Sequence, residues 1–188
     1  MRRTDAFPSA RVLRSAALLE RAWALPSARG YAPLLSQGFN AICGPTSVAN
    51  VLRSMGVSTG RNPFRRFGLR AMSLDQLTRE SAEVVPAAWR VESVRPPTVE
   101  ALRDELRRSN DDDRRLIANF SRAPLFGRGG GHHSPIGGYL ETEDLAFVLD
   151  VNAGFGPWLV QAEALFEAMN TTADWTTGLT RGLARFSR

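Results

Sequence analysis

The sequence contains no lysine and a single cysteine, Cys43, among its 188 residues. One cysteine excludes an internal disulfide and any zinc or redox site built on a CxxC pair. No apolar run approaches the roughly 20 residues that a membrane-spanning helix needs, and Arg2-Arg3 is not followed by the apolar core of a secretory signal. From these absences we expect a protein of a reducing compartment, with a cytoplasmic location and no membrane partner.

The positive charge of the chain is carried by arginine alone. The 24 basic residues exceed the 19 acidic ones and give a net charge of +5. Because the arginines are scattered among acids and no nucleic-acid-binding motif accompanies them, we predict no nucleic-acid partner. A mild positive excess suits a small anionic substrate better.

The order of helix and strand signals predicts an α+β fold, with a helical N-terminal half and an antiparallel sheet in the C-terminal half. We expect residues 1–30 to form a flexible segment with a short helix and residues 31–188 to form a single catalytic domain. The basic segment 61–70 is expected to be a loop that folds over the domain. The predicted helices are 16–25, 43–55, 73–83, one that begins at the cap Thr98, and 162–169; the predicted strands are 91–94, 116–121, 132–140, 145–151, 158–160 and 179–186.

Cys43 lies directly at the start of a predicted helix. Gly44-Pro45 suits a first helical turn, where the missing proline N–H costs nothing, and four apolar residues between positions 48 and 55 follow at helical spacing. At a helix N-terminus, free backbone N–H groups and the positive end of the dipole lower the pKa of a thiol and can bind an oxyanion. We therefore interpret Cys43 as a nucleophile; the alternative is an inert structural cysteine.

A cysteine nucleophile needs a base for its proton and a third group that orients the base. The two histidines, His132 and His133, are adjacent on a predicted strand, so only one of them should reach the cysteine, and the other is expected to be exposed or stacked. Asp150 is a charge in an apolar strand and a candidate orienter; a strand-end carboxylate that reaches water is an equally good interpretation. The side-chain amide of Gln37 can donate to an oxyanion.

The hairpin around the turn Glu141–Asp144 decides whether His132 and Asp150 can meet. With a loop of three or five residues, both side chains project from the same face of neighbouring strands. With a four-residue loop they do not, unless a β-bulge shifts the register. The catalytic interpretation therefore predicts one of these registers.

Several motifs resemble those of the phytochelatin synthase family, in the same order along the chain. Together they extend over most of residues 31–186, and the string around the histidines is highly specific. The matching segments are Gln37…Cys43-Gly44, Ala71-Met-Ser-Leu-Asp-Gln-Leu77, Gly131-His-His-Ser-Pro-Ile-Gly-Gly-Tyr139, Leu149-Asp150-Val151 and Ala168-Met-Asn-Thr…Thr-Arg-Gly182, where the family carries Q-x5-CG, GMTLDEL, GHFSPIGGY, LDV and AMNT…RG.

The resemblance implies a papain-like cysteine peptidase fold. Members of this family attack the Cys–Gly bond of glutathione with a cysteine thiolate, release glycine and hold γ-Glu-Cys as a thioester. The acyl group then passes to a second glutathione, which makes phytochelatin for heavy-metal detoxification, or to water. By position, the resemblance makes Cys43 the nucleophile, His132 rather than His133 the acid and base, Asp150 the orienter and Gln37 the oxyanion donor.

The same resemblance assigns a substrate pocket. Asp174 and Arg181 would hold the ammonium and carboxylate of the γ-glutamyl group, and Gly131, Asn119 and Arg122 would line the pocket. No metal site and no protein-bound cofactor are expected, because one cysteine and two adjacent histidines form no metal cage. Cd²⁺ or Zn²⁺ would enter as thiolate complexes of glutathione. The expected partner is glutathione, and a homodimer is an assembly that the sequence leaves open.

Two departures from the family pattern bear on the acceptor step. His133 stands where the family has an aromatic residue, and Asn152-Ala-Gly-Phe155 replaces a stretch whose two basic residues are thought to contact substrate. Hydrolysis to γ-Glu-Cys is therefore expected at least as much as chain extension. Two alternatives stay open: a papain-like peptidase acting on another γ-glutamyl thiol or peptide, and a non-catalytic binder of glutathione or metal thiolates. Retention of Asp174 and Arg181 favours a γ-glutamyl substrate.

Overall fold

The computed structural model describes residues 9–39, 41–64, 71–173 and 178–188. Asp174 and most of the predicted basic loop 61–70 lie outside the described residues. No helix in the described part of the chain is long and apolar enough to cross a membrane.

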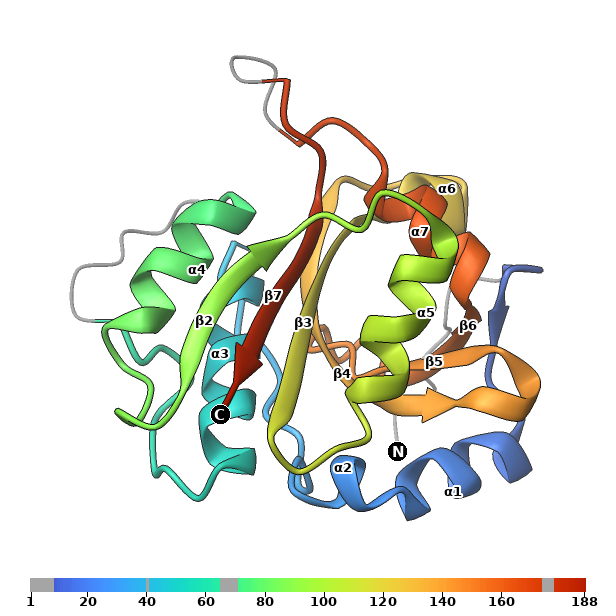
Figure 1. Ribbon diagram of the computed structural model, residues 1–188. Helices are drawn as coiled ribbons and strands as arrows, with labels where there is room; N and C mark the ends of the chain where they lie inside the picture. The colour runs from blue at the N-terminus through green and yellow to red at the C-terminus, as the bar shows by residue number, and fades with distance from the viewer. Residues whose placement is uncertain (1–8, 40, 65–70, 174–177) are drawn as a thin grey trace.

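One sheet of seven strands runs through the described residues, in the spatial order β1-β6-β5-β4-β3-β7-β2 (Figure 1). Every neighbouring pair of these strands is antiparallel, which confirms the predicted α+β class. The strands are β1 (Val12–Leu13), β2 (Arg90–Val94), β3 (Arg114–Ser121), β4 (Gly131–Leu140), β5 (Leu145–Val148), β6 (Trp158–Gln161) and β7 (Gly182–Ser187).

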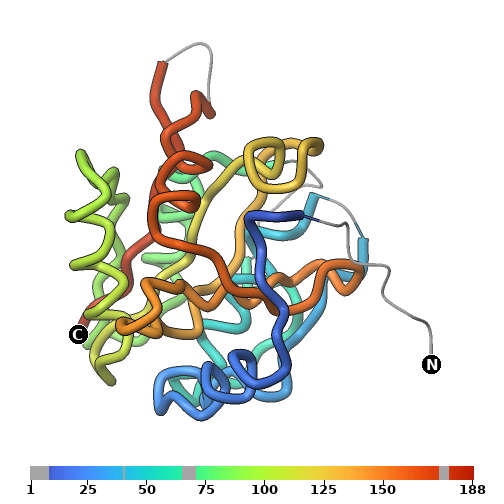
Figure 2. Tube along the Cα trace, turned by 90° about the vertical axis from the view of Figure 1, so that its right-hand side faces the viewer, coloured from blue at the N-terminus to red at the C-terminus, as the bar shows by residue number. Residues whose placement is uncertain are grey.

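Helices cover both faces of the sheet. On one face lie α1 (Ala16–Ala24), α3 (Cys43–Ser54) and α4 (Leu74–Ala82); on the other lie α5 (Val99–Arg108), α6 (Ala123–Phe126) and α7 (Ala162–Met169). The short α2 (Pro26–Arg29) follows α1, and in both views these two helices lie at the end of the sheet opposite α6 (Figures 1 and 2). Alternate residues of β3 therefore enter different cores: Phe120 packs with the α5–α7 layer and Ile117 with the α3 layer.

Side-chain caps begin two helices at the predicted positions. The Ser73 hydroxyl accepts a hydrogen bond from the Gln76 N–H at 3.1 Å and begins α4. The Thr98 hydroxyl accepts from the Ala101 N–H at 3.2 Å and begins α5. Both bonds satisfy a first-turn donor that the helix itself cannot pair.

The described residues before position 31 belong to this fold. β1 pairs with β6, and Ala22 and Ala28 are fully buried. β1 was not predicted, because two residues carry no periodic pattern and the strand exists only through its partner. The single turn α6 was also not predicted, and β7 begins at Gly182, later than the predicted residue 179.

Candidate active site

Cys43 is the first residue of α3, as predicted, and no side chain caps the helix there. The N-cap residue is Ile42, the first turn contains no acidic residue, and Pro45 has no N–H. The N–H groups of Cys43 and Gly44 precede the first helical hydrogen bonds and are open to a ligand beside the sulfur. The predicted apolar face of the helix is confirmed by the full burial of Val48, Val51 and Leu52 against the sheet.

The thiol of Cys43 lies beside two imidazoles. Its Sγ atom is 3.9 Å from Nδ1 of His133. Burial by itself raises the pKa of the Cys43 thiol, but hydrogen bonds from His132 and then from His133, together with their charge, lower it to about 5. At neutral pH the sulfur is therefore a thiolate, the form that attacks a carbonyl carbon.

Both histidines are buried: His132 is 5% exposed and His133 is 3% exposed. The expectation that the second histidine is exposed is therefore wrong, and both imidazoles act on the pKa of the Cys43 thiol. Neither face of β4 is open at this point. Phe120 packs edge-on against His132, at 5.7 Å between ring centroids, whereas α3 covers the side of the strand that carries His133.

His132 and Asp150 meet, with 3.0 Å between Nε2 of His132 and Oδ1 of Asp150. The loop between β4 and β5 has the four residues Glu141–Asp144, three of which form the short 3₁₀ helix η1 (Glu141–Glu143). An unbroken register across a loop of this length would put the two side chains on opposite faces. A bulge is therefore required, as predicted for this case.

The bulge lies at Gly137, in the Gly-Gly pair of β4. Gly137 is the extra residue because the pairs on either side of it are Gly138–Phe147 and Ile136–Val148. The shifted register continues beyond the end of β5, where the Leu149 N–H donates to the Pro135 carbonyl at 2.9 Å. This shift of one residue brings His132 and Asp150 to the same face.

Packing explains why glycines form the bulge. A Cβ on Gly137 would lie 2.8 Å from a buried phenylalanine ring, and Gly138 has φ +151°, which residues with a side chain rarely adopt. Two polar side chains hold the segment: the Ser27 hydroxyl donates to the Gly137 carbonyl at 2.8 Å, and the Asn110 side-chain oxygen accepts from the Tyr139 N–H at 2.9 Å. The catalytic register therefore depends on contacts far along the chain.

Asp150 is 1% exposed, so the alternative of a carboxylate that reaches water is wrong. Arg122 grips both oxygens, with Nη2 2.9 Å from Oδ1 and Nη1 2.8 Å from Oδ2. The Trp158 indole N–H donates to Oδ2 at 3.1 Å and the Asn152 backbone N–H to Oδ1 at 2.9 Å. The carboxylate is thus held by four hydrogen bonds, including the one to His132, and by the ion-pair contact of Nη1 of Arg122.

The charges of this cluster support one another. Burial alone would raise the pKa of Asp150, but the charges of His132 and Arg122 and their hydrogen bonds hold it far below its usual range. Burial alone would lower the pKa of His132, but the Asp150 charge and hydrogen bond raise it. The raised pKa favours the protonated form of His132, from which a proton can be delivered beside the thiolate.

Arg122 lies beneath Asp150 among aromatic rings. Its guanidinium carbon is 3.7 Å from the centroid of Phe155 and 5.7 Å from that of Phe126. Phe155 belongs to the segment that replaces the family's basic residues, so this departure supplies packing for Arg122. Arg122 acts on the site through Asp150, and its predicted contact with substrate stays a prediction.

Gln37 and Asn119 flank the catalytic groups. The Gln37 N–H donates to the Val151 carbonyl at 2.7 Å, which ties the loop before α3 to the residue after Asp150. The Gln37 side-chain oxygen is buried and has no partner among the described residues, and since amide oxygen and nitrogen can be exchanged, the same site can present an N–H. Asn119 donates its amide to the His132 carbonyl at 3.1 Å.

Arg181 lies against Gly131, the residue before His132. A Cβ on Gly131 would be 3.0 Å from Nη2 of Arg181. Nη1 donates to the Thr171 hydroxyl at 2.9 Å and to the Thr172 carbonyl at 2.7 Å, whereas the buried Nε has no partner among the described residues. Burial lowers the pKa of Arg181. The predicted pairing of this cation with Asp174 stays a prediction, because Asp174 lies outside the described residues.

Sequence reasoning missed two residues that hold the site. Trp158 donates to Asp150, and the only local signal for it is that a buried indole N–H needs an acceptor. The Ser47 hydroxyl of α3 donates to the His133 carbonyl at 3.0 Å, for which the sequence carries no signal.

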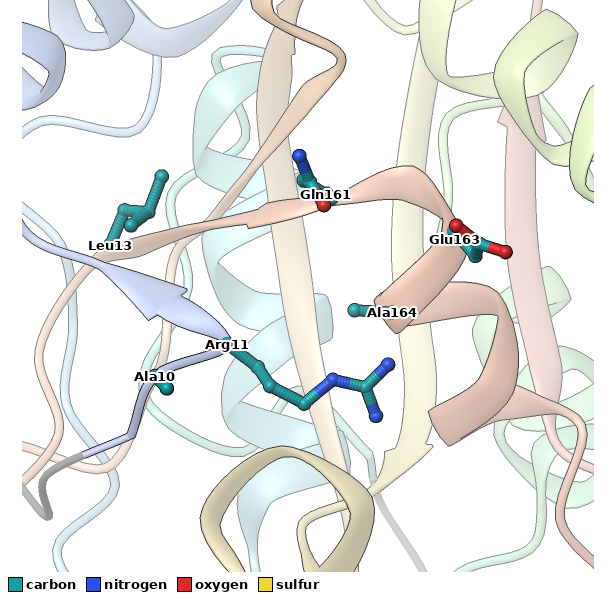
Figure 3. A pocket seen from close by; sticks show the side chains of 6 residues that line it. All are labelled: Ala10, Arg11, Leu13, Gln161, Glu163 and Ala164. Atoms are coloured by element: carbon teal, nitrogen blue, oxygen red, sulfur yellow. The ribbon is translucent and has the colours of Figure 1, made fainter.

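A separate cavity of about 250 Å³ lies where β1 and β6 meet the start of α7 (Figure 3). None of its lining residues is a predicted site residue. They are Ala10, Arg11, Leu13, Gln161, Glu163 and Ala164. In the part of the chain that the structure describes, no group of three or more His, Cys, Asp or Glu side chains could hold a metal ion.

Comparison with known proteins shows which family this sequence resembles. The sequence profile of phytochelatin synthase matches residues 68–183, more than half of the chain. The chain belongs to the phytochelatin synthase family.

Plant phytochelatin synthase relatives match over most of the chain. Glutathione gamma-glutamylcysteinyltransferase 1 of Triticum aestivum is 34% identical over 171 residues, and the proteins of the same name numbered 3 in Lotus japonicus and 2 in Arabidopsis thaliana are 31% identical. Each match covers 81% of this chain but 34% to 38% of the relative. The chain therefore spans about a third of the length of these curated relatives.

The fold of this phytochelatin synthase family member also has a counterpart among solved structures. The peptidase domain of Streptococcus ComA, a bifunctional ABC transporter, superposes with a TM-score of 0.56 over 81% of this chain and 96% of that domain. At 15% identity the likeness shows the fold alone. It confirms the predicted papain-like cysteine peptidase fold.

Proposed function

We propose that this protein cleaves the Cys–Gly bond of glutathione through a γ-Glu-Cys thioester on Cys43 and passes the acyl group to a second glutathione or to water. The observation that carries the proposal is the thiolate of Cys43 at the start of α3 beside the buried His132–Asp150 pair. The choice of glutathione rests on the family and on the name of the curated relatives, glutathione gamma-glutamylcysteinyltransferase.

The first step is attack of the Cys43 thiolate on the carbonyl carbon of the cysteinyl residue of glutathione. A C–S bond forms and the carbonyl oxygen becomes an oxyanion. The open N–H groups at the start of α3 and the Gln37 side-chain amide supply donors for that oxyanion. Donors fixed before the reaction stabilise the developing charge without reorganisation.

The proton for the leaving group comes from His132. Asp150 holds Nε2 of His132, so Nδ1 is the nitrogen that remains for proton exchange. His132 gives its Nδ1 proton to the glycine nitrogen, the C–N bond breaks, and glycine leaves. His132 is then neutral and can take a proton from the acceptor that attacks the thioester. Asp150 orients the ring and stabilises its charged form.

Arg181 would bind the carboxylate of the γ-glutamyl group. It lies against Gly131, next to His132, and its Nε is a buried donor without a partner among the described residues. A carboxylate beside a guanidinium forms short, charge-assisted hydrogen bonds. Asp174, which the family pattern pairs with it, would bind the ammonium group.

The acceptor decides between synthesis and hydrolysis. Attack by the amino group of a second glutathione lengthens the peptide, whereas attack by water releases γ-Glu-Cys. The loss of the family's basic pair at Asn152-Ala-Gly-Phe155 weakens the second site, which favours water. Cd²⁺ or Zn²⁺ would act as thiolate complexes of the acceptor, and a free thiolate nucleophile fits a reducing, cytoplasmic setting.

The alternative substrates are other γ-glutamyl thiols or peptides, since a papain-like site can act on any amide that fits. Incubation with glutathione, with and without Cd²⁺ or Zn²⁺, and mass spectrometry of the products test the choice, with Cys43→Ala as control. Glycine with (γ-Glu-Cys)₂-Gly indicates a transferase, and glycine with γ-Glu-Cys alone indicates a hydrolase. No glycine from folded wild-type protein would overturn the glutathione assignment.

A further inference from the structure

His133 is a second imidazole at the Cys43 sulfur, and the mechanism above gives it no role. Its Nδ1 lies 3.9 Å from Sγ. The side chain is buried, and its other nitrogen, Nε2, has no hydrogen-bond partner among the described residues. A buried imidazole whose one nitrogen faces the nucleophile and whose other nitrogen has no partner among the described residues needs an explanation.

The ring is fixed between α3 and β4. Ser47, one turn into α3, donates to the His133 carbonyl at 3.0 Å. Gly44 lies against the same ring: a Cβ there would lie at the ordinary contact distance of 3.8 Å from Nδ1 of His133, and at a tight 3.1 Å from a Leu77 methyl group of α4. The contact between His133 and the sulfur is therefore a product of the packing of the catalytic helix on its strand.

The two histidines differ in their counter-charge. Asp150, itself held by Arg122, faces His132 and stabilises its cation. Among the described residues, the charged and titratable groups around the Cys43 thiol are His132, His133 and, behind His132, Asp150 and Arg122. No carboxylate bonds to His133 in the described part of the chain, and the anion beside this ring is the Cys43 thiolate itself.

We propose that His133 is a fixed hydrogen-bond donor that holds the Cys43 thiolate through Nδ1–H, while His132, which Asp150 orients, exchanges protons with the substrate. A proton on Nδ1 gives the sulfur a donor at the position that the packing fixes. His133 is thus a catalytic residue of a kind different from His132, since it touches the reacting sulfur but is oriented by no carboxylate among the described residues.

The role matters most in the second half of the reaction, and here it rests on the proposed function. When the acceptor attacks the thioester, the C–S bond breaks and its electron pair returns to the sulfur, while His132 takes the acceptor's proton. The leaving thiolate needs a donor that is already in place. His133 supplies that donor from a buried side chain.

Size-matched variants separate the donor from the shape of the ring. His133→Leu removes the N–H, and His133→Asn keeps an amide N–H near the position of Nδ1. The pH dependence of Cys43 alkylation by iodoacetamide reports the thiolate directly, because the chain has one cysteine. We expect His133→Leu to raise the midpoint by about one to two pH units, as for loss of a hydrogen bond to a charged group, and His133→Asn to restore most of the shift.

An unchanged midpoint in His133→Leu, or an equal shift in both variants, would overturn the proposal. If neither variant folds, as judged by circular dichroism, ¹⁵N NMR of the wild-type histidines decides. We expect Nδ1 of His133 to carry a proton, and an Nε2–H tautomer with a bare Nδ1 would contradict the proposal. Neither measurement uses glutathione, so a failed glutathione assay leaves this inference intact and a failed titration leaves the proposed substrate intact.

Discussion

Replacement of Asp150 by asparagine should cost far more stability than the same change at an exposed aspartate. The side chain of Asp150 is fully buried and accepts hydrogen bonds at both oxygens, and Arg122, whose side chain is 8% exposed, pairs with each of them. An amide nitrogen cannot accept. In either orientation of the substituted amide, its nitrogen would face at least two donors, and Arg122 would be left as a buried charge without a counter-charge.

Removal of one partner of a buried ion pair costs about 3–5 kcal/mol, out of a total free energy of unfolding of roughly 5–15 kcal/mol for a domain. Asp144 provides the matched control. Arg103 also forms a bidentate pair with Asp144, with Nε 3.0 Å from Oδ1 and Nη2 2.7 Å from Oδ2, but both side chains are about a third exposed. Asp144→Asn should therefore cost about 1 kcal/mol or less.

Urea unfolding at neutral pH, followed by tryptophan fluorescence, measures both changes. We expect Asp150→Asn to lower the free energy of unfolding by several times the loss in Asp144→Asn. We also expect Arg122→Met to rescue part of the loss in the double variant, because it removes the unpaired charge. Equal losses in the two asparagine variants would refute the argument that burial makes the Asp150–Arg122 pair indispensable.

Three further predictions concern the bulge, the substrate pocket and the thiol. Gly138→Ala should destabilise the protein by more than Gly56→Ala. Both positions have positive φ, which costs an alanine about 1–3 kcal/mol of strain, but a Cβ at Gly138 also meets three atoms at 2.6–2.8 Å, whereas a Cβ at Gly56 meets open space. Equal losses of unfolding free energy in chemical denaturation would contradict the bulge packing. Arg181→Gln should raise the KM for glutathione roughly tenfold, as for loss of a charged hydrogen bond, with little change in kcat; a fall in kcat alone would exclude a role in ground-state binding. The pKa of Cys43 falls from 9.0 to about 5 on folding, so the unfolded chain binds a proton that the folded chain has lost between these values. The stability of the wild type relative to Cys43→Ala should therefore rise with pH from about 5 to 9, and a flat or falling difference in thermal denaturation would show that the thiol is not perturbed.

Local signals were sufficient to place the starts of α3, α4 and α5. The caps Ser73 and Thr98 and the Gly-Pro pair after Cys43 act within one turn, so their positions follow from the sequence and the structure confirms them. The hairpin could be predicted only conditionally. The four-residue loop is a local feature, whereas the bulge at Gly137 depends on Ser27 and Asn110, which are distant in sequence.

Contacts between distant segments account for what the sequence did not predict. The burial of His133 depends on how closely α3 packs on β4. The ion pair of Arg122 and Asp150 depends on how the residue after β3 meets the residues after β5. β1 has no signal apart from its partner β6. In each case the residue type was visible, but the burial and the partner that define its role arise only in the folded chain.

Intact-protein mass spectrometry after rapid quenching tests the central claim most directly. Wild-type protein mixed with glutathione should carry one γ-Glu-Cys group on Cys43, with one glycine released for each group bound, before any longer peptide accumulates. Asp144→Asn should behave like the wild type, and Cys43→Ala should show neither the adduct nor the glycine. Folded wild-type protein that releases no glycine and carries no adduct, or glycine release by Cys43→Ala at the wild-type rate, would contradict acyl transfer through Cys43.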